Sequence, residues 1–76
     1  MRAVATVETT LEWRDLRFHV VTREPPTESQ LLLLRQVLGR LDSVGSFADA
    51  LGVCFGRRVR IRTIRPSPDI WFDVGL

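Results

Sequence analysis

The sequence predicts an α+β fold of the order ββα(α)ββ, in which an antiparallel sheet of about four strands has one main helix packed on one face. Three observations predict it. Residues 3–13 and 16–21 alternate in polarity, residues 27–41 repeat apolar side chains at helical spacing, and residues 58–74 alternate again around a proline-containing turn. The order of the strands in the sheet stays open.

Length and composition indicate a single small globular domain, residues 1–76. A chain this short builds one core, because it buries only about 60% of the surface of its unfolded form. The hydrophobic fraction of 45% and the charged fraction of 26% are typical of a globular protein rather than a disordered one. The longest aliphatic run, residues 31–34, is far short of the ~20 residues of a membrane span, so we expect no membrane partner.

Residue usage adds expectations about the cellular setting. The single cysteine cannot form an intramolecular disulfide, which fits a reducing, cytoplasmic location. The first residues do not resemble a signal peptide, because Glu8 interrupts their apolar character. All 11 basic residues are arginine, and lysine, asparagine and tyrosine, whose codons are AT-rich, do not occur. We therefore expect a GC-rich bacterial or phage genome.

The first two strands are predicted to form a hairpin. Residues 3–13 place apolar and small side chains at odd positions and mainly polar ones at even positions, as a half-buried strand does. A two-residue turn at Arg14 and Asp15 would give cross-strand pairs that agree in polarity. These pairs are Trp13 with Leu16, Leu11 with Phe18, Glu12 with Arg17 and Thr10 with His19.

The main helix is predicted over residues 27–41. Thr27 and Gln30 have the spacing of a capping box, and Pro25 and Pro26 keep the preceding residues out of the helix. Gly45 is the expected left-handed terminator. The helix would place its large aliphatic side chains on one side: Leu31, Leu33, Leu34, Val37, Leu38 and Leu41.

Leu32 and Gly39 do not fit this pattern, because both lie on the polar side of the helix. A glycine inside a helix costs ~1 kcal/mol relative to alanine, so it usually has a reason. One hypothesis is a docking patch for a partner or for a second copy of the chain in a homodimer. The alternatives are a loop that folds over Leu32, or a single exposed leucine of the kind common on protein surfaces.

A second, shorter helical segment is predicted after the main helix. Ser46 and Asp49 have N-cap spacing and Gly52 is a stop signal, which together indicate one or two helical turns. Residues 53–55 either prolong this helix or begin a strand. Gly56 and Arg57 are expected to turn the chain.

The C-terminal segment is predicted to form a second hairpin around residues 66–69. Apolar and arginine side chains alternate along its first strand, and residues 70–74 form its second. A four-residue loop would match the polarity of the two strands. The resulting pairs are Arg65 with Ile70, Ile64 with Trp71, Thr63 with Phe72, Arg62 with Asp73 and Ile61 with Val74.

The charge is distributed unevenly along the chain, although the net charge is only +2. Residues 50–68 contain five arginines and no acidic residue, whereas the rest of the chain contains six arginines and nine acidic residues. Arg58, Arg60 and Arg62 point to one face of a strand, beside Trp71 on the next strand. Such a ladder can bind an acidic protein surface, or nucleic acid by phosphate contacts and base stacking. Alternatively, Asp73 and Trp71 engage the arginines within the sheet, and arginines on an outer strand deter aggregation.

His19 and Cys54 are the other candidates for a site of chemistry. His19 has Glu8 and Glu12 as diagonal neighbours, but no nucleophile or metal-ligand cluster accompanies it, so we expect no catalytic residues. Cys54, between Val53 and Phe55, is expected to pack in the core, and the neighbouring arginines offer a less favoured route to a reactive thiolate. One histidine and one cysteine without zinc-ligand spacing argue against a zinc site.

These patterns together predict a small non-enzymatic protein that binds a macromolecular partner, as an accessory, regulatory or inhibitory protein. The expected partner is a protein with an acidic surface, and DNA or RNA is the alternative. The partner-binding residues we expect are Arg58, Arg60, Arg62 and Trp71 on the sheet, and Leu32 and Gly39 on the helix. No cofactor and no metal are implied.

Overall fold

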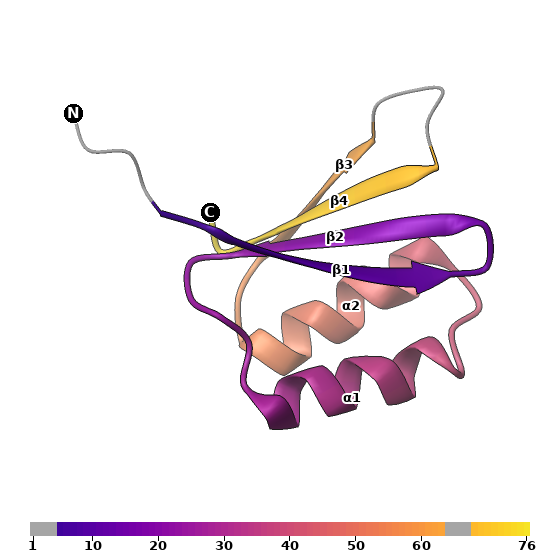
Figure 1. The fold of residues 1–76 in the computed structure, drawn as a ribbon, viewed down its shortest axis with the longest axis horizontal. Helices are drawn as coiled ribbons and strands as arrows, with labels where there is room; N and C mark the ends of the chain where they lie inside the picture. Colours follow the sequence, from indigo (N-terminus) through magenta and orange to yellow (C-terminus); the bar gives the residue numbers. More distant parts are fainter. Residues whose placement is uncertain (1–4, 64–67) are drawn as a thin grey trace.

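The structure of the chain is a computed structural model that describes residues 5–63 and 68–76. It has two layers: a sheet, and a pair of helices that both lie against the same face of that sheet (Figure 1). The elements in chain order are β1 (Val7–Trp13), β2 (Leu16–Thr22), α1 (Glu28–Leu38), α2 (Val44–Phe55), β3 (Val59–Thr63) and β4 (Asp69–Val74). The predicted order ββα(α)ββ is therefore confirmed.

The strand order is β1-β2-β4-β3, and the sheet is mixed rather than antiparallel. Both hairpins are antiparallel, but β2 and β4 lie side by side in parallel at the centre. The prediction of an antiparallel sheet was wrong because it rested on hairpins alone. The two helices lie between β2 and β3 in the chain, and a connection of that length lets strands from separate hairpins meet in parallel.

The first hairpin has the predicted register. Arg14 and Asp15 form the turn, and Leu11 faces Phe18 as expected. Arg14 adopts a positive φ of 55°, the left-handed conformation that tight hairpin turns require. Alternating polarity therefore fixed this pairing correctly, although β1 begins only at Val7 and residues 3 and 4 of the predicted strand lie outside the described residues.

The second hairpin is shifted by two residues from its predicted register. Ile61 pairs with Phe72 instead of Val74, and Arg62 pairs with Trp71 instead of Asp73. A two-residue shift keeps every side chain on its predicted face, so polarity cannot distinguish the two registers. The predicted partners of Trp71 and Ile70, residues 64 and 65, lie outside the described residues.

Helix α1 begins as predicted and ends earlier. The Thr27 hydroxyl accepts from the Gln30 backbone N–H, and the Gln30 side chain accepts from the Thr27 backbone N–H. The last helical residue is Leu38, and Gly39 is the C-cap. Leu34 is fully buried, but Leu38 is only partly buried and Leu33 is 45% exposed, so the predicted apolar side was too wide.

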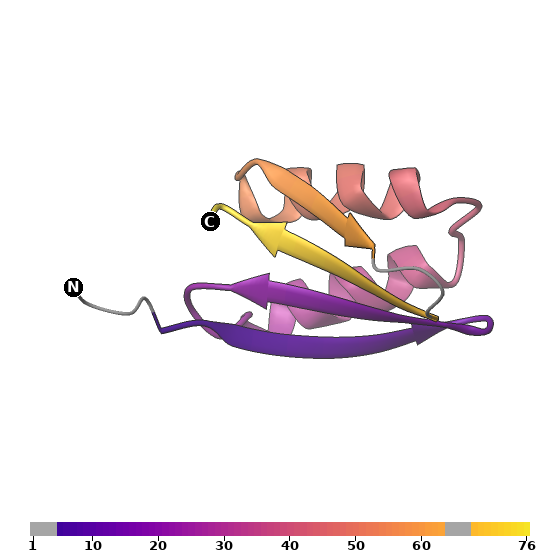
Figure 2. The ribbon, with the colours of Figure 1, turned by 90° about the horizontal axis from the view of Figure 1, so that it is seen from above.

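Helix α2 is longer than predicted, and it supplies the centre of the core. It runs three turns from its N-cap Ser43, so Gly45 lies inside the helix rather than ending the previous one. Gly56 ends it in the left-handed conformation, with φ 61°. The prediction of one main helix and a second helix of one or two turns is therefore corrected to two helices of similar length, which lie beneath the sheet (Figure 2).

The core lies between the sheet and the two helices and is built around three phenylalanines from three elements. Phe18, Phe47 and Phe72 are fully buried, and their ring centroids lie 4.8–5.1 Å apart. Such aromatic clusters add ~0.5–1.5 kcal/mol per pair beyond the burial of their area. The apolar face of the sheet is thereby covered, and within residues 5–63 and 68–76 no helix lies on its other face (Figure 1).

Candidate functional site

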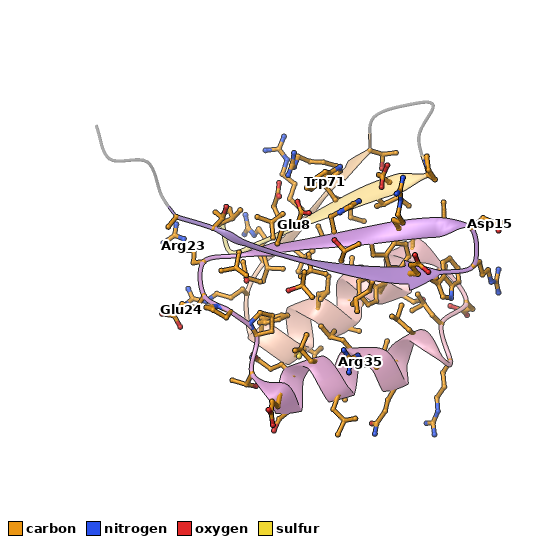
Figure 3. All side chains as sticks on the ribbon, viewed as in Figure 1. Glu8, Asp15, Arg23, Glu24, Arg35 and Trp71 are labelled. Atoms are coloured by element: carbon orange, nitrogen blue, oxygen red, sulfur yellow. The ribbon has the colours of Figure 1, made fainter. Side chains whose placement is uncertain are left out.

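The face of the sheet that points away from the helices gathers charged side chains from all four strands. We call it the open face. Figure 3 shows Trp71 and Glu8 on this side and Arg35 on α1. By strand alternation and register, its side chains are Glu8, Thr10 and Glu12 on β1, Arg17, His19 and Val21 on β2, Asp69, Trp71 and Asp73 on β4, and Arg60 and Arg62 on β3, with Arg58 immediately before β3.

A hydrogen-bonded network around His19 links β1, β2 and β4 on this face. His19 Nε2 lies 2.7 Å from Asp69 Oδ1, and since a carboxylate only accepts, Nε2 carries the proton. His19 Nδ1 lies 3.3 Å from the Thr10 hydroxyl and 3.4 Å from Glu8 Oε2. Arg17 Nε adds an ion pair of 2.9 Å to Asp69. The His19 side chain, only 12% exposed, is therefore held on both ring nitrogens.

Trp71 is flanked by side chains from the strands on either side of β4. The His19 ring stacks on it with centroids 4.2 Å apart and planes 18° apart. From β3, the Arg62 guanidinium carbon lies 5.4 Å from the centre of the Trp71 ring, within cation–π range. The indole is thus held in a fixed position, and neighbouring side chains already contact its ring.

Arg62 is bound within the sheet by Asp73. Its Nε and Nη2 donate to the two carboxylate oxygens at 2.5 and 2.8 Å. Hydrogen bonding to the Asp73 carboxylate raises the pKa of the Arg62 guanidinium. The ion pair within the sheet that was predicted for Arg62 is therefore present. It is a diagonal contact, because the residue directly opposite Asp73 is Arg60.

Arg58 and Arg60 remain exposed, and neither has an ionic partner within residues 5–63 and 68–76. Arg60 lies opposite Asp73, whose carboxylate is already taken by Arg62. Arg58 lies opposite Gly75, whose backbone N–H donates to the Arg58 carbonyl and which has no side chain to offer. The ladder predicted from the sequence therefore consists of one internally paired arginine and two available ones.

The Leu32–Gly39 stripe lies on the helix layer, apart from the arginine face. Leu32 is 58% exposed, so the idea that a loop covers it is wrong. Gly39 caps α1 and, with Leu33, Val37 and Arg40, lines a shallow depression. The sequence hypothesis thus located an exposed leucine correctly, but the six predicted partner-binding residues form two separate surfaces.

The surroundings of Cys54 do not favour a reactive thiol. Burial raises the pKa of the Cys54 thiol, which opposes formation of a reactive thiolate, and the side chain packs against the core as predicted. Among the described residues, no three His, Cys, Asp or Glu side chains are grouped so as to hold a metal ion. Within the same ranges, neither helix is long and apolar enough to cross a membrane.

The sequence alone did not reveal the contacts between His19 and β4. Asp69 is 50 residues from His19, and the two meet only because β2 and β4 are parallel neighbours. A shallow cleft of about 450 Å³ at the carboxyl ends of β2 and β4 was also not expected. Arg23, Arg57 and Glu24 are among its lining residues, and the one buried hydroxyl there, that of Thr22, already donates to the Glu24 carbonyl.

Comparison of the chain with protein-family models, with curated proteins and with solved structures gives no match.

Proposed function

We propose that this protein is a small non-enzymatic binding module that acts on another protein, in an accessory, regulatory or inhibitory role. The binding surface is the basic side of the open face, where Arg58 and Arg60 supply the charge. Arg62 and Trp71 hold that surface in place through their contacts with Asp73 and His19. The observation that carries the proposal is that two exposed guanidiniums remain unpaired beside a network that is otherwise paired.

Mixed charge on the open face favours a protein over nucleic acid as the partner. A phosphate backbone that approached Arg60 would also approach Asp73, and Asp69, Glu8 and Glu12 lie on the same face. Acidic groups beside the arginines oppose the counterion-driven binding on which non-specific nucleic-acid affinity depends. A protein surface can place acids and bases to match such a pattern.

The occupied ring of Trp71 also weakens the alternative of DNA or RNA binding. Base stacking contributes ~1–3 kcal/mol per base where an aromatic side chain offers a bare π-face. Here His19 stacks on the ring at 4.2 Å, and Arg62 approaches it from the other neighbouring strand. A base could stack only after one of these contacts is broken.

The surroundings of His19 support a structural role rather than catalysis. A general base must come within hydrogen-bond reach of the substrate proton that it removes, and an enclosed ring restricts that reach. Both nitrogens of His19 lie within 3.3 Å of Asp69 or Thr10, and the side chain is 12% exposed. We assign it to holding β1, β2 and β4 in register on the open face.

Charge reversal at the proposed surface tests this function. The double variant R58E/R60E and the single variant Arg23→Glu would be used beside wild type in affinity capture from a lysate of the organism that encodes the chain. Arg23 is a matched control, because it is an exposed arginine on the loop after β2. We expect the same discrete proteins with wild type and Arg23→Glu, and their loss with R58E/R60E.

Two results of the capture experiment would oppose the proposal. Proteins retained by R58E/R60E but lost with Leu32→Glu would move the binding surface to α1. Proteins that disappear from the wild-type capture after nuclease treatment would assign the arginines to nucleic acid. Unfolding curves of each variant ensure that a lost partner does not reflect a lost fold.

A further inference from the structure

We infer that the outer edge of β3 docks an extended segment of the partner protein, with acidic residues at alternate positions, as an added strand of the sheet. This inference rests on the proposed function and specifies how the partner is held. Strand addition supplies affinity through main-chain hydrogen bonds and specificity through alternate side chains. β3 offers both kinds of contact.

The backbone of β3 has hydrogen-bonding groups that point out of the sheet. β3 is the last strand in the order β1-β2-β4-β3, so one of its edges has no neighbour among the strands of residues 5–63 and 68–76. The Gly75 N–H donates to the Arg58 carbonyl at 2.8 Å, which makes this a hydrogen-bonded pair. Such pairs recur at every second residue of an antiparallel ladder. Arg60 and Arg62 therefore bond to β4, and Val59, Ile61 and Thr63 direct their N–H and C=O groups outward.

The side chains of β3 define what an added strand should carry. Directly opposed cross-strand residues lie ~4.5–5.5 Å apart, close enough for ion pairs. Positions beside Arg58 and Arg60 would therefore take Glu or Asp, because both guanidiniums lack an ionic partner within the described residues. On the other face Ile61 is 43% exposed, and it would pack against an apolar or β-branched side chain. The segment that fits alternates acidic and apolar residues.

Pairing between two copies of β3 is disfavoured by the same charges. Two β3 edges would place arginines against arginines, and like charges directly opposite each other destabilise a sheet. The β1 edge of a second copy carries Glu8 and Glu12, four residues apart on one face, but a β3–β1 contact is head-to-tail and would assemble copies into rings or open filaments. The occupant we commit to is therefore a separate acidic segment.

A labelled peptide of alternating Glu and Val, nine residues long, is the probe, and its fluorescence anisotropy reports binding. Two changes separate main-chain docking from charge. Methylating the backbone nitrogens of alternate peptide residues removes donors but keeps every charge. Ile61→Pro removes an outward N–H of β3, at an edge position where proline is tolerated. Arg60→Glu reverses one charge and leaves the β3 backbone intact.

We expect the unmodified peptide to bind wild type, and each of the three changes to weaken binding at least 10-fold. A peptide with Lys in place of Glu should not bind. If Ile61→Pro does not fold, the methylated peptide, which is tested on wild-type protein, still distinguishes main-chain docking from binding by charge alone.

Three outcomes would overturn strand addition. If Arg60→Glu weakens binding and methylation does not, the peptide docks by charge alone, which leaves the proposed function intact. Absence of binding at millimolar peptide also rejects this mode, and the capture experiment then judges the proposed function separately. Growth of wild-type assemblies with concentration, without peptide, would make a second copy the occupant.

Discussion

The Asp73 carboxylate holds one of the β3 arginines, Arg62, against the sheet. The Asp73 side chain is 13% exposed and accepts two hydrogen bonds from Arg62, although Arg60 stands directly opposite it. Because Arg60 stands directly opposite Asp73, we expect it to pair with this carboxylate when Arg62 is removed. A single substitution should therefore underestimate how much the ion pair with Asp73 stabilises the protein, because the other arginine can replace the one that is removed.

Removal of Arg60 and Arg62 should consequently be non-additive. Arg62→Ala should cost less than ~1 kcal/mol of unfolding free energy, because Arg60 can take its place and the pair is largely exposed on the arginine side. Arg60→Ala should cost still less. The double variant leaves a mostly buried carboxylate without a partner. Its loss of unfolding free energy should exceed the sum of the two single losses by ~0.5–1 kcal/mol. Urea unfolding of the four proteins measures this, and simple additivity would show that Arg60 does not substitute.

At the scale of elements, the sequence predicted strands better than helix ends. Period-two alternation located β1 and β2 with their register, and the capping box located the start of α1. Helix α2 was shortened in the prediction because Gly45 and Gly52 are ordinary stop signals. In the structure, a Cβ at position 52 would lie 3.5 Å from the Arg57 carbonyl oxygen and 4.0 Å from Val59. Gly52 thus lies inside α2 beside the turn that follows the helix, and an added Cβ would make only ordinary van der Waals contacts there.

The glycines at the two ends of α2 should respond oppositely to alanine. Gly45→Ala adds a methyl group where no other atom lies within 4 Å, so it should stabilise the helix by up to ~1 kcal/mol. Gly56→Ala forces a side chain into φ 61° and should destabilise by ~1 kcal/mol or more. Thermal unfolding of both variants provides the measurement. Stabilisation by Gly56→Ala would mean that α2 does not end in the left-handed conformation there.

At the scale of the whole molecule, the strand order was the main feature beyond sequence reasoning. The central pair β2 and β4 contains Phe18, Val20 and Phe72, all fully buried, whereas β3 alternates arginines and is mostly exposed. The apolar character of each strand therefore fits its central or edge place. It cannot reveal that β2 and β4 run parallel, and the His19–Asp69 contact depends on that arrangement. The arginine ladder could be located from sequence, but its division into paired and available members could not.

Substitutions of Leu34 and Leu32 on α1 should have very different effects on stability, because one side chain is buried and the other is exposed. Leu34 is fully buried, so Leu34→Ala should cost ~2–5 kcal/mol, a large part of the ~4–11 kcal/mol expected for 76 residues. Leu32→Glu should change the unfolding free energy by no more than ~0.5 kcal/mol, because the side chain is 58% exposed. Light scattering beside the melts tests self-association. A Leu32→Glu protein as unstable as Leu34→Ala would show that α1 is rotated.

Titrating both kinds of ligand into one labelled sample shows whether the basic side of the open face binds protein rather than nucleic acid. Uniformly ¹⁵N-labelled protein would be titrated at ~50 mM salt with the alternating Glu–Val peptide and with mixed-sequence single- and double-stranded oligonucleotides. We expect the peptide to shift amide signals of β3 and β4 and the oligonucleotides to shift none. Oligonucleotide-induced shifts at Arg58, Arg60 and the Trp71 indole, weakening with salt at a log–log slope of roughly −2 to −3, would contradict this expectation.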